Sequence, residues 1–201
     1  MNYNIRNTDS KDFLDTVNLT RETFWNLYKS GCDEHLVLHN LRKSDDYIPE
    51  LDFVIESDNQ IIGNIVYSKA NILDESKGII PVIVLGPVTV HPDYQGSGLG
   101  SKLIIHTLEI AKALGYIAVF LYGSPHYYPR FGFENAEKYG VTTLDGANFD
   151  PFMCCELMPN SLEGIHGKLM ESKVFLVNEQ ELLEFEKGFP YKEKGEPKIK
   201  I

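Results

Sequence analysis

Residues 91–104 read HPDYQGSGLGSKLI, and this stretch decides the fold of the chain. It places three glycines within five positions and then continues as an apolar pattern typical of a helix. The segment directly before it, VIVLGPVTV at 82–90, is typical of a buried strand. A fixed glycine costs conformational entropy, so this spacing predicts that the backbone between strand and helix approaches something closely.

Two familiar phosphate-binding loops do not match the pattern. A Walker loop needs glycine directly followed by lysine, but here a serine stands between Gly100 and the lysine. A dinucleotide fingerprint needs a carboxylate about 20 residues after its glycines, and residues 116–120 read YIAVF. The remaining pattern, Gln95-x-x-Gly98-x-Gly100, favours a pyrophosphate held by bare N–H groups at a helix N-terminus. A glycine-rich turn that only packs the helix against the sheet is the alternative.

The flanking segments predict a mixed α/β domain. Apolar residues recur on one face of 98–114, and Gly115 follows where a helix usually ends. Further helices are expected at 10–25, 33–44 and 178–188, and strands at 3–7, 51–56, 60–70, 79–90, 116–122, 152–157 and within 161–172. Helices and a hairpin come first and strand–helix–strand follows, so one parallel crossover is predicted.

The composition favours an ordinary globular protein over a nucleic-acid or membrane protein. The 201 residues carry a formal net charge of −10, whereas a nucleic-acid binder needs a basic surface. The start MNYNIRNTDSKDF does not resemble a signal peptide, and no apolar run reaches membrane-spanning length. The three cysteines have neither disulfide nor metal spacing, so we expect a cytoplasmic protein.

Other reactive side chains are expected to be structural. His35 and His39 are one helical turn apart, but the glutamate that a zincin places after its first histidine is missing, so a helix-surface pair is predicted. Cys154 and Cys155 alternate along a strand, which predicts that one of them packs in the core. No metal is expected.

The glycine motif, preceded by a strand ending VTVHP at 88–92, resembles the acyl-CoA signature of the GNAT acyltransferase superfamily. The runs LGPVTVHPDYQGSGLGSKLI (85–104), FLYGSP (120–125) and YYPRFGF (127–133) resemble its bacterial YhbS-like branch. The resemblance implies an α/β (α+β) GNAT fold, whose mixed central sheet contains a splayed parallel strand pair and is flanked by helices. It implies one GNAT domain over 1–160. Residues 161–201 would then be a C-terminal extension, a strand and a short helix docked on the domain, with a frayed end.

The resemblance also implies that acetyl-CoA binds as co-substrate. The N-terminus of the 98–114 helix would hold the pyrophosphate, and free backbone groups of the splayed strand would pair with pantetheine. Gly86-Pro87 is the expected point of disruption, because proline removes a ladder donor. Ser124 stands where the family often has an asparagine that contacts pantetheine. The implied acetyl-CoA-binding residues are Val88, Thr89, Val90, Gln95, Gly96, Ser97, Gly98, Leu99, Gly100, Ser101, Ser124 and Tyr128.

Three groups are candidates for the chemistry. The family's thiolate acid is usually a tyrosine four residues before a Gly-Phe pair, which corresponds to Tyr128, and a phenol has a suitable pKa. The alternative is that this tyrosine only wedges its segment against the sheet. A backbone N–H around Val88 would bind the oxyanion. Glu22 is a possible base, although an ordinary solvated helix glutamate is the alternative.

Taken together, the sequence predicts an N-acetyltransferase that transfers acetyl directly to a primary amine of a small molecule or peptide. The alternative is a non-catalytic acyl-CoA-binding sensor module of the same fold. The expected partners are acetyl-CoA and an amine acceptor, with no nucleic acid and no membrane, for a monomer or homodimer. Nothing in the sequence identifies the amine.

Overall fold

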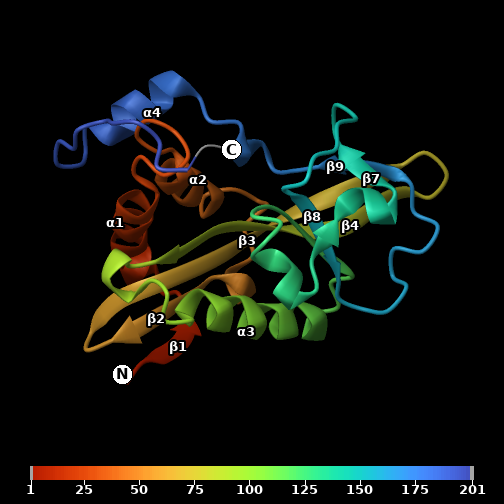
Figure 1. Cartoon of the computed structure of the whole chain (residues 1–201), viewed down its shortest axis with the longest axis horizontal. Coiled ribbons are helices and arrows are strands. Elements are labelled where there is room, and N and C mark those ends of the chain that lie inside the picture. Colours follow the sequence, from red (N-terminus) through yellow and green to blue (C-terminus); the bar gives the residue numbers. More distant parts are fainter. Residues whose placement is uncertain (1, 200–201) are drawn as a thin grey trace. The chain divides into compact units, whose positions relative to one another are not determined.

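The computed structural model describes residues 2–199 (Figure 1). Its main elements are, in chain order, β1 (Asn4–Asn7), η1 (Ser10–Asp12), α1 (Phe13–Phe24), α2 (Glu34–Leu41), β2 (Phe53–Ser57), β3 (Gln60–Asp74), β4 (Gly78–Val90), η3 (Pro92–Tyr94), α3 (Leu99–Ala113), β5 (Ala118–Tyr122), η4 (Tyr128–Phe131), β6 (Glu134–Asn135), β7 (Val141–Thr143), β8 (Phe152–Glu156), β9 (Gly167–Met170) and α4 (Glu179–Glu186). Within this described part, no helix combines the length and apolar character that a membrane crossing needs.

The chain forms two compact units, and β3, β4 and α3 each run from one unit into the other. The first unit comprises the described residues of Met1–Val66, Pro87–Leu103 and Lys173–Ile201. The second unit comprises Tyr67–Gly86 and Ile104–Ser172. The segment expected as one C-terminal extension is therefore divided between the two units.

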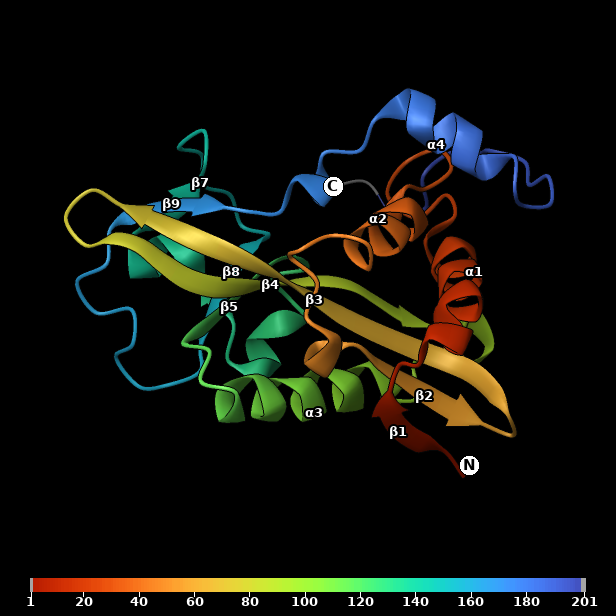
Figure 2. The ribbon, with the colours of Figure 1, turned by 180° about the vertical axis from the view of Figure 1, so that it is seen from behind.

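An antiparallel sheet of β1, β2 and the start of β3 is the frame of the first unit, and Figure 2 shows these strands side by side. β1 pairs with β2 from Asn4↔Glu56 to Asn7↔Phe53. The register of β2 with β3 shifts between Ile55 and Glu56, which marks a β-bulge. The predicted hairpin is confirmed, and its bulge increases the local twist of the sheet.

Helices cover both faces of β3 in this unit. α1 and α2 bury apolar side chains such as Leu38 and Leu41 against Val66. Gly63 lies three residues earlier and therefore faces the opposite side of the sheet. A Cβ at Gly63 would lie 3.3 Å from a methyl group of Leu103 in α3. The bare glycine thus lets α3 approach the strand closely.

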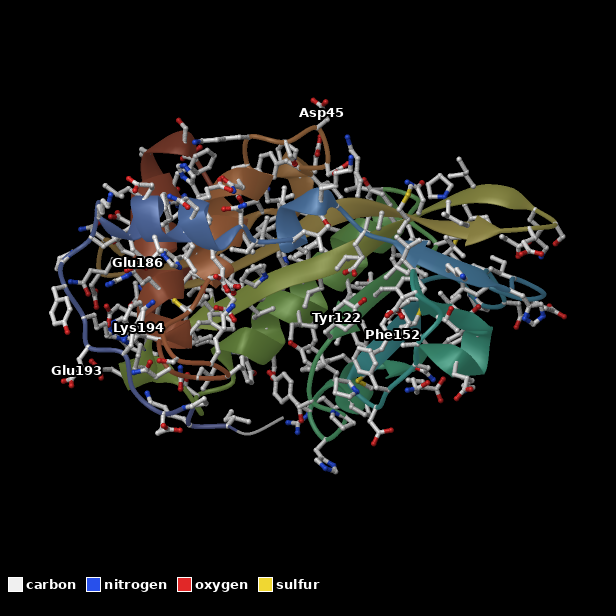
Figure 3. The ribbon with its side chains drawn as sticks, turned by 90° about the horizontal axis from the view of Figure 1, so that it is seen from above. Asp45, Tyr122, Phe152, Glu186, Glu193 and Lys194 are labelled. Atoms are coloured by element: carbon white, nitrogen blue, oxygen red, sulfur yellow. The ribbon has the colours of Figure 1, made fainter. Side chains whose placement is uncertain are left out.

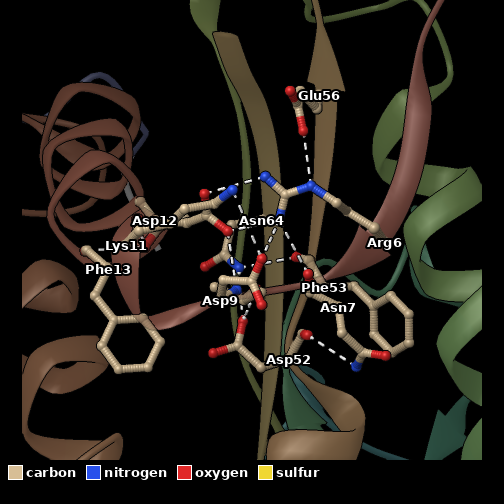
Figure 4. A network of polar contacts seen from close by, with 12 residues as sticks. Arg6, Asn7, Asp9, Lys11, Asp12, Phe13, Asp52, Phe53, Glu56 and Asn64 are labelled. Carbon is tan, nitrogen blue, oxygen red and sulfur yellow. Dashed lines mark hydrogen bonds and ion pairs between the residues drawn. The ribbon is translucent and has the colours of Figure 1, made fainter. Parts of the chain in front are cut away.

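A fully buried carboxylate, Asp52, joins β2 to the segments around it (Figure 4). Its Oδ1 accepts hydrogen bonds from Thr8 Oγ1 at 2.5 Å and Asn64 Nδ2 at 2.9 Å. Its Oδ2 accepts from Arg42 Nε and Tyr47 OH, both at 2.8 Å. The Arg42 side chain is only 2% exposed, so the two charges neutralise each other inside the unit.

A second ion pair in Figure 4 holds β1 against β2 and η1. Arg6 donates two hydrogen bonds to Asp12, at 2.6 and 3.0 Å, and one to Glu56 at 2.7 Å. The Asp12 carboxylate also accepts from the backbone N–H of Asp9 at 2.9 Å, which caps the entry into η1 and α1. The hydrogen bonds from Arg6 hold the pKa of Asp12 below its ordinary value.

The helix α4 is fixed to α1 and α2 by a buried charged group. Glu186, labelled in Figure 3, accepts from Arg21 Nη2 at 2.7 Å and lies 2.7 Å from His35 Nε2. The predicted helix-surface pair is wrong for His35, which is completely buried against Phe185 and Phe189 of the C-terminal segment. Burial lowers the pKa of His35 to about 4, so the ring is neutral at neutral pH.

The segment after α4 differs from the expected frayed end. Trp25 Nε1 donates to the Glu193 carbonyl at 2.8 Å, and Lys198 N donates to the Asn26 carbonyl at 2.9 Å. The described residues up to 199 therefore follow the turn that leaves α1. The sequence gives no sign of this, because the C-terminal segment makes these contacts through backbone groups that any residue carries.

The second unit contains the mixed part of the sheet. β4 pairs with β5 in parallel, and β5 pairs with β8 in the antiparallel sense from Ala118↔Glu156 to Tyr122↔Phe152. β6 continues from β8, while β9 pairs with the end of β3 and with β7. The predicted combination of parallel and antiparallel strands flanked by helices is confirmed. The short β6 and β7 were not predicted, because strands of two and three residues carry too little pattern.

Replacement of Asp52 tests the buried network. Asp52→Ala leaves the Arg42 guanidinium buried without its counter-charge, and we expect the free energy of unfolding to fall by about 3–5 kcal/mol. Chemical denaturation measures this loss. The control Asp15→Ala removes an exposed carboxylate of α1 and should change stability by no more than about 0.5 kcal/mol. Equal effects of both changes would contradict the importance of the network.

Candidate functional site

The parallel ladder between β4 and β5 is short. It pairs Ile83 with Val119 and Val84 with Phe120, although β5 continues to Tyr122. The ladder therefore stops just before the Gly86-Pro87 step at which the sequence predicted a disruption. Strands that part in this way leave backbone N–H and C=O groups available for a ligand.

The end of β4 belongs to the first unit, where its two sides differ. Thr89 is completely buried and donates to the Asn64 carbonyl at 3.3 Å, whereas Val88 and Val90 are partly exposed. The Val90 carbonyl accepts from Gln95 Nε2 at 3.1 Å and from Thr23 Oγ1 at 3.4 Å. The Gln95 side chain thus ties the following loop back onto the strand.

The glycine loop adopts a backbone that suits glycine alone. Gly96 has φ +74° and Gly98 has φ +83°, both in the left-handed region. A Cβ at either position would meet no protein atom within 4 Å, so the glycines are not required by internal packing. Ser97 between them is exposed, and its hydroxyl donates to the Tyr94 carbonyl. The left-handed turns therefore leave open space along the loop.

The helix α3 begins directly behind this loop. Its hydrogen-bond ladder starts with the bond from Lys102 N to the Gly98 carbonyl at 3.1 Å. The first turn, with buried Leu99 followed by Gly100 and Ser101, contains no acidic residue. No carboxylate of that turn would therefore compete with an anion for the first N–H groups and the positive end of the helix dipole.

Ser124 and Tyr128 lie in the second unit, on the turn that follows β5. The Ser124 carbonyl accepts from Tyr127 N at 3.0 Å and Tyr128 N at 3.2 Å, and its hydroxyl accepts from His126 N at 3.3 Å. Ser124 therefore shapes the turn that leads into η4. Pro129 occupies the start of this 3-10 helix, which agrees with its fixed φ and missing N–H.

The ring of Tyr128 lies against the backbone of Gly123, the residue directly after β5. A Cβ at Gly123 would come within 2.2 Å of Tyr128 Cε2, so only glycine permits this position. Edge-to-face contacts with Tyr127 at 5.1 Å and Phe133 at 5.7 Å fix the ring from other sides. The sequence pattern predicts a role for Tyr128 but gives no sign of Gly123, whose role depends on a contact across the turn.

Glu22 has a different environment from the one a base requires. Its side chain is 53% exposed and forms an ion pair with Lys192 at 2.5 Å. This contact with the C-terminal segment agrees with the alternative of a solvated helix glutamate.

The cysteines and acidic groups do not assemble into another reactive centre. Cys154 and Cys155 are both buried, where one had been predicted, and burial raises the pKa of Cys155 to about 11. Within residues 2–199, no three His, Cys, Asp or Glu side chains are grouped to hold a metal ion.

Comparisons with known proteins agree with this geometry. The family model described as "Acetyltransferase (GNAT) domain" matches residues 4–136. The chain is 27% identical to the uncharacterized N-acetyltransferase YhbS of Escherichia coli (strain K12) over 140 residues, which cover 70% of this chain and 81% of the relative. It is 34% identical over 86 residues to the uncharacterized N-acetyltransferase YjhQ of the same organism, covering 43% of this chain and 47% of that protein.

Two solved structures are similar over most of the chain. The crystal structure of Escherichia coli YhbS in complex with CoA has a TM-score of 0.77 and 26% identity, with 87% of this chain and 92% of that chain covered. A GNAT family acetyltransferase from Brucella melitensis in complex with acetyl-CoA has a TM-score of 0.69 and 26% identity, with 87% and 98% covered.

Proposed function

The chain belongs to the GNAT acetyltransferase family, and we propose that it transfers the acetyl group of acetyl-CoA to a primary amine of a small molecule or peptide. The observation that carries this proposal is the open, left-handed glycine loop at the start of α3. The relatives solved with CoA and acetyl-CoA support the choice of ligand. We place the reaction in the cytoplasm, because the three cysteines are free thiols, as a reducing compartment requires.

The pyrophosphate binds, in this proposal, to the backbone N–H groups of the loop 95–101. Gln95 positions the loop through its bond to Val90, and Gly96 and Gly98 keep it free of side chains. The pantetheine arm pairs with the backbone of 88–90 at the end of β4, where the N–H of Val88 binds the oxyanion. The Val90 carbonyl is less available for this pairing, since two side chains already donate to it.

Tyr128 protonates the departing thiolate in this proposal. Gly123 and the surrounding aromatic rings fix its ring, so the hydroxyl needs little reorganisation at the moment of transfer. Ser124 contributes by shaping the turn that carries the tyrosine.

A single-turnover assay tests the function as a whole. The protein is mixed with acetyl-CoA and a panel of primary amines, and free CoA thiol and acetylated amine are measured. We expect both products in equal amounts. Binding of acetyl-CoA without consumption, with every amine, would instead favour the sensor module.

Replacement of Gly98 tests the pyrophosphate loop. Gly98→Val forces a branched side chain into a left-handed position and into the open space of the loop, so CoA affinity should fall at least about tenfold, or ~1.4 kcal/mol. Calorimetry on the folded variant measures the dissociation constant. Gly78→Val is a matched control, because Gly78 has φ +82° and is equally open but is the first residue of β4, far along the chain from the loop. Gly78→Val should lose similar stability and keep its CoA affinity. If both variants bound CoA equally well, the glycine loop would serve only to pack α3 against the sheet.

Replacement of Tyr128 tests the acid. Tyr128→Phe keeps the ring and removes the hydroxyl, so the turnover number should fall about 100-fold while CoA affinity stays the same. Tyr127→Phe is the internal control and should keep its turnover. Full turnover in both variants would assign Tyr128 to packing.

A further inference from the structure

An aromatic surface lies at the end of β5, in the second unit. The rings of Tyr122 and Phe149 are stacked, with centroids 5.8 Å apart and planes at 20°, and Phe152 stacks on Tyr122 at 5.2 Å and 22°. Figure 3 shows Tyr122 and Phe152 next to each other. Phe152 is fully buried, but Tyr122 is 43% and Phe149 44% exposed. Two of the three rings are therefore accessible to a ligand from solvent.

A carboxylate adjoins the exposed rings. The Tyr122 hydroxyl donates to Glu171 Oε2 at 2.8 Å, and Glu171 directly follows β9. Burial raises the pKa of Glu171, and the hydrogen bond from Tyr122 opposes this only in part. The pKa of Tyr122 is raised mainly by burial and by the charge of Glu171. The charge of Asp145 makes a smaller contribution in the same direction. The surface thus combines aromatic faces with negative charge, which is what an organic cation needs.

The position of this surface relates it to the chemistry. Tyr122 is the last residue of β5, and the ring of Tyr128 covers Gly123, the next residue along the chain. Both lie at the end of β5 that extends beyond the ladder pair Val84–Phe120. The exposed rings and the proposed acid therefore adjoin the same end of one strand.

Resting on the proposed acetyl transfer, we propose that Tyr122, Phe149 and Glu171 form the acceptor subsite, and that its substrate class is a small arylalkylamine. The flat apolar part of the amine stacks on the exposed rings, and its ammonium group binds the Glu171 carboxylate. Stacking with offset or edge contacts favours an aromatic over a saturated ring. The carboxylate selects a cation, which agrees with the protonated state of such amines in solution.

The same carboxylate has a role in proton transfer. The ammonium gives one proton to Glu171, and the neutral nitrogen attacks the acetyl carbonyl carbon. The C–N bond forms, and the C–S bond breaks with its electron pair going to sulfur. Tyr128 protonates the thiolate, and the proton that nitrogen loses on becoming an amide restores Tyr128. Glu171 then releases its proton to water, so the sum is ammonium plus thioester giving amide, thiol and one proton.

Kinetics with two amines test the subsite. We expect the wild-type protein to acetylate 2-phenylethylamine with a kcat/KM about fivefold above that for 2-cyclohexylethylamine. Phe149→Leu should abolish this preference. Glu171→Gln should lower kcat/KM for both amines at least about tenfold, and the affinity for acetyl-CoA should not change in either variant.

The chain supplies a matched control for the carboxylate. Tyr139 OH donates to Glu134 Oε2 at 2.9 Å, the same pairing elsewhere in the same unit, so Glu134→Gln should leave both kcat/KM values unchanged. Acetylation of both amines that is unaffected by Phe149→Leu and Glu171→Gln would overturn the subsite but keep the proposed function. If no amine is acetylated, the proposed function fails, and calorimetric binding of 2-phenylethylamine to the acetyl-CoA-loaded protein still decides the subsite. The subsite would be overturned if the wild type and Glu171→Gln bound 2-phenylethylamine equally, or if neither protein bound it.

Discussion

The rest of the site depends on the early end of the ladder between β4 and β5. Two residue pairs, Ile83–Val119 and Val84–Phe120, form the parallel ladder, and three residues further along β4 stands Pro87, which lacks an N–H. From there the backbone groups of the parted strands are not used by the ladder. In the second unit, Ser124 and Tyr128 follow the free end of β5 directly along the chain.

Each unit stabilises its part of the machinery in a different way. The first unit buries charges in matched pairs, Arg42 with Asp52 and Arg21 with Glu186, and so fixes α1, α2 and α4 around β3. A buried charge is costly when its partner is removed, so each pair depends on both of its members. The second unit relies on aromatic packing, and glycine at position 123 allows a ring to lie on the strand itself.

Sequence patterns describe the local backbone of the glycine loop better than the contacts of side chains with distant segments. The spacing predicts a bare backbone in this loop, and the glycines at 96 and 98 adopt left-handed conformations, which restrict the residue type locally. Glu22 was chosen by its place on a helix, and its exposure and ion pair with Lys192 depend on a segment 170 residues further along the chain. The expected frayed end and the surface position of His35 differ from the structure for the same reason.

The sequence by itself determined the order of the elements, the hairpin, the parallel crossover and the glycine loop before α3. These features follow from the spacing of apolar residues along the chain and from the backbone preferences of glycine and proline. Both signals act within a few positions of the sequence. Only the tertiary structure decided that Glu186 pairs with Arg21, that Tyr128 lies over Gly123 and that Glu171 adjoins Tyr122. Such contacts join residues through space, and their energy depends on burial and distance that no local pattern records.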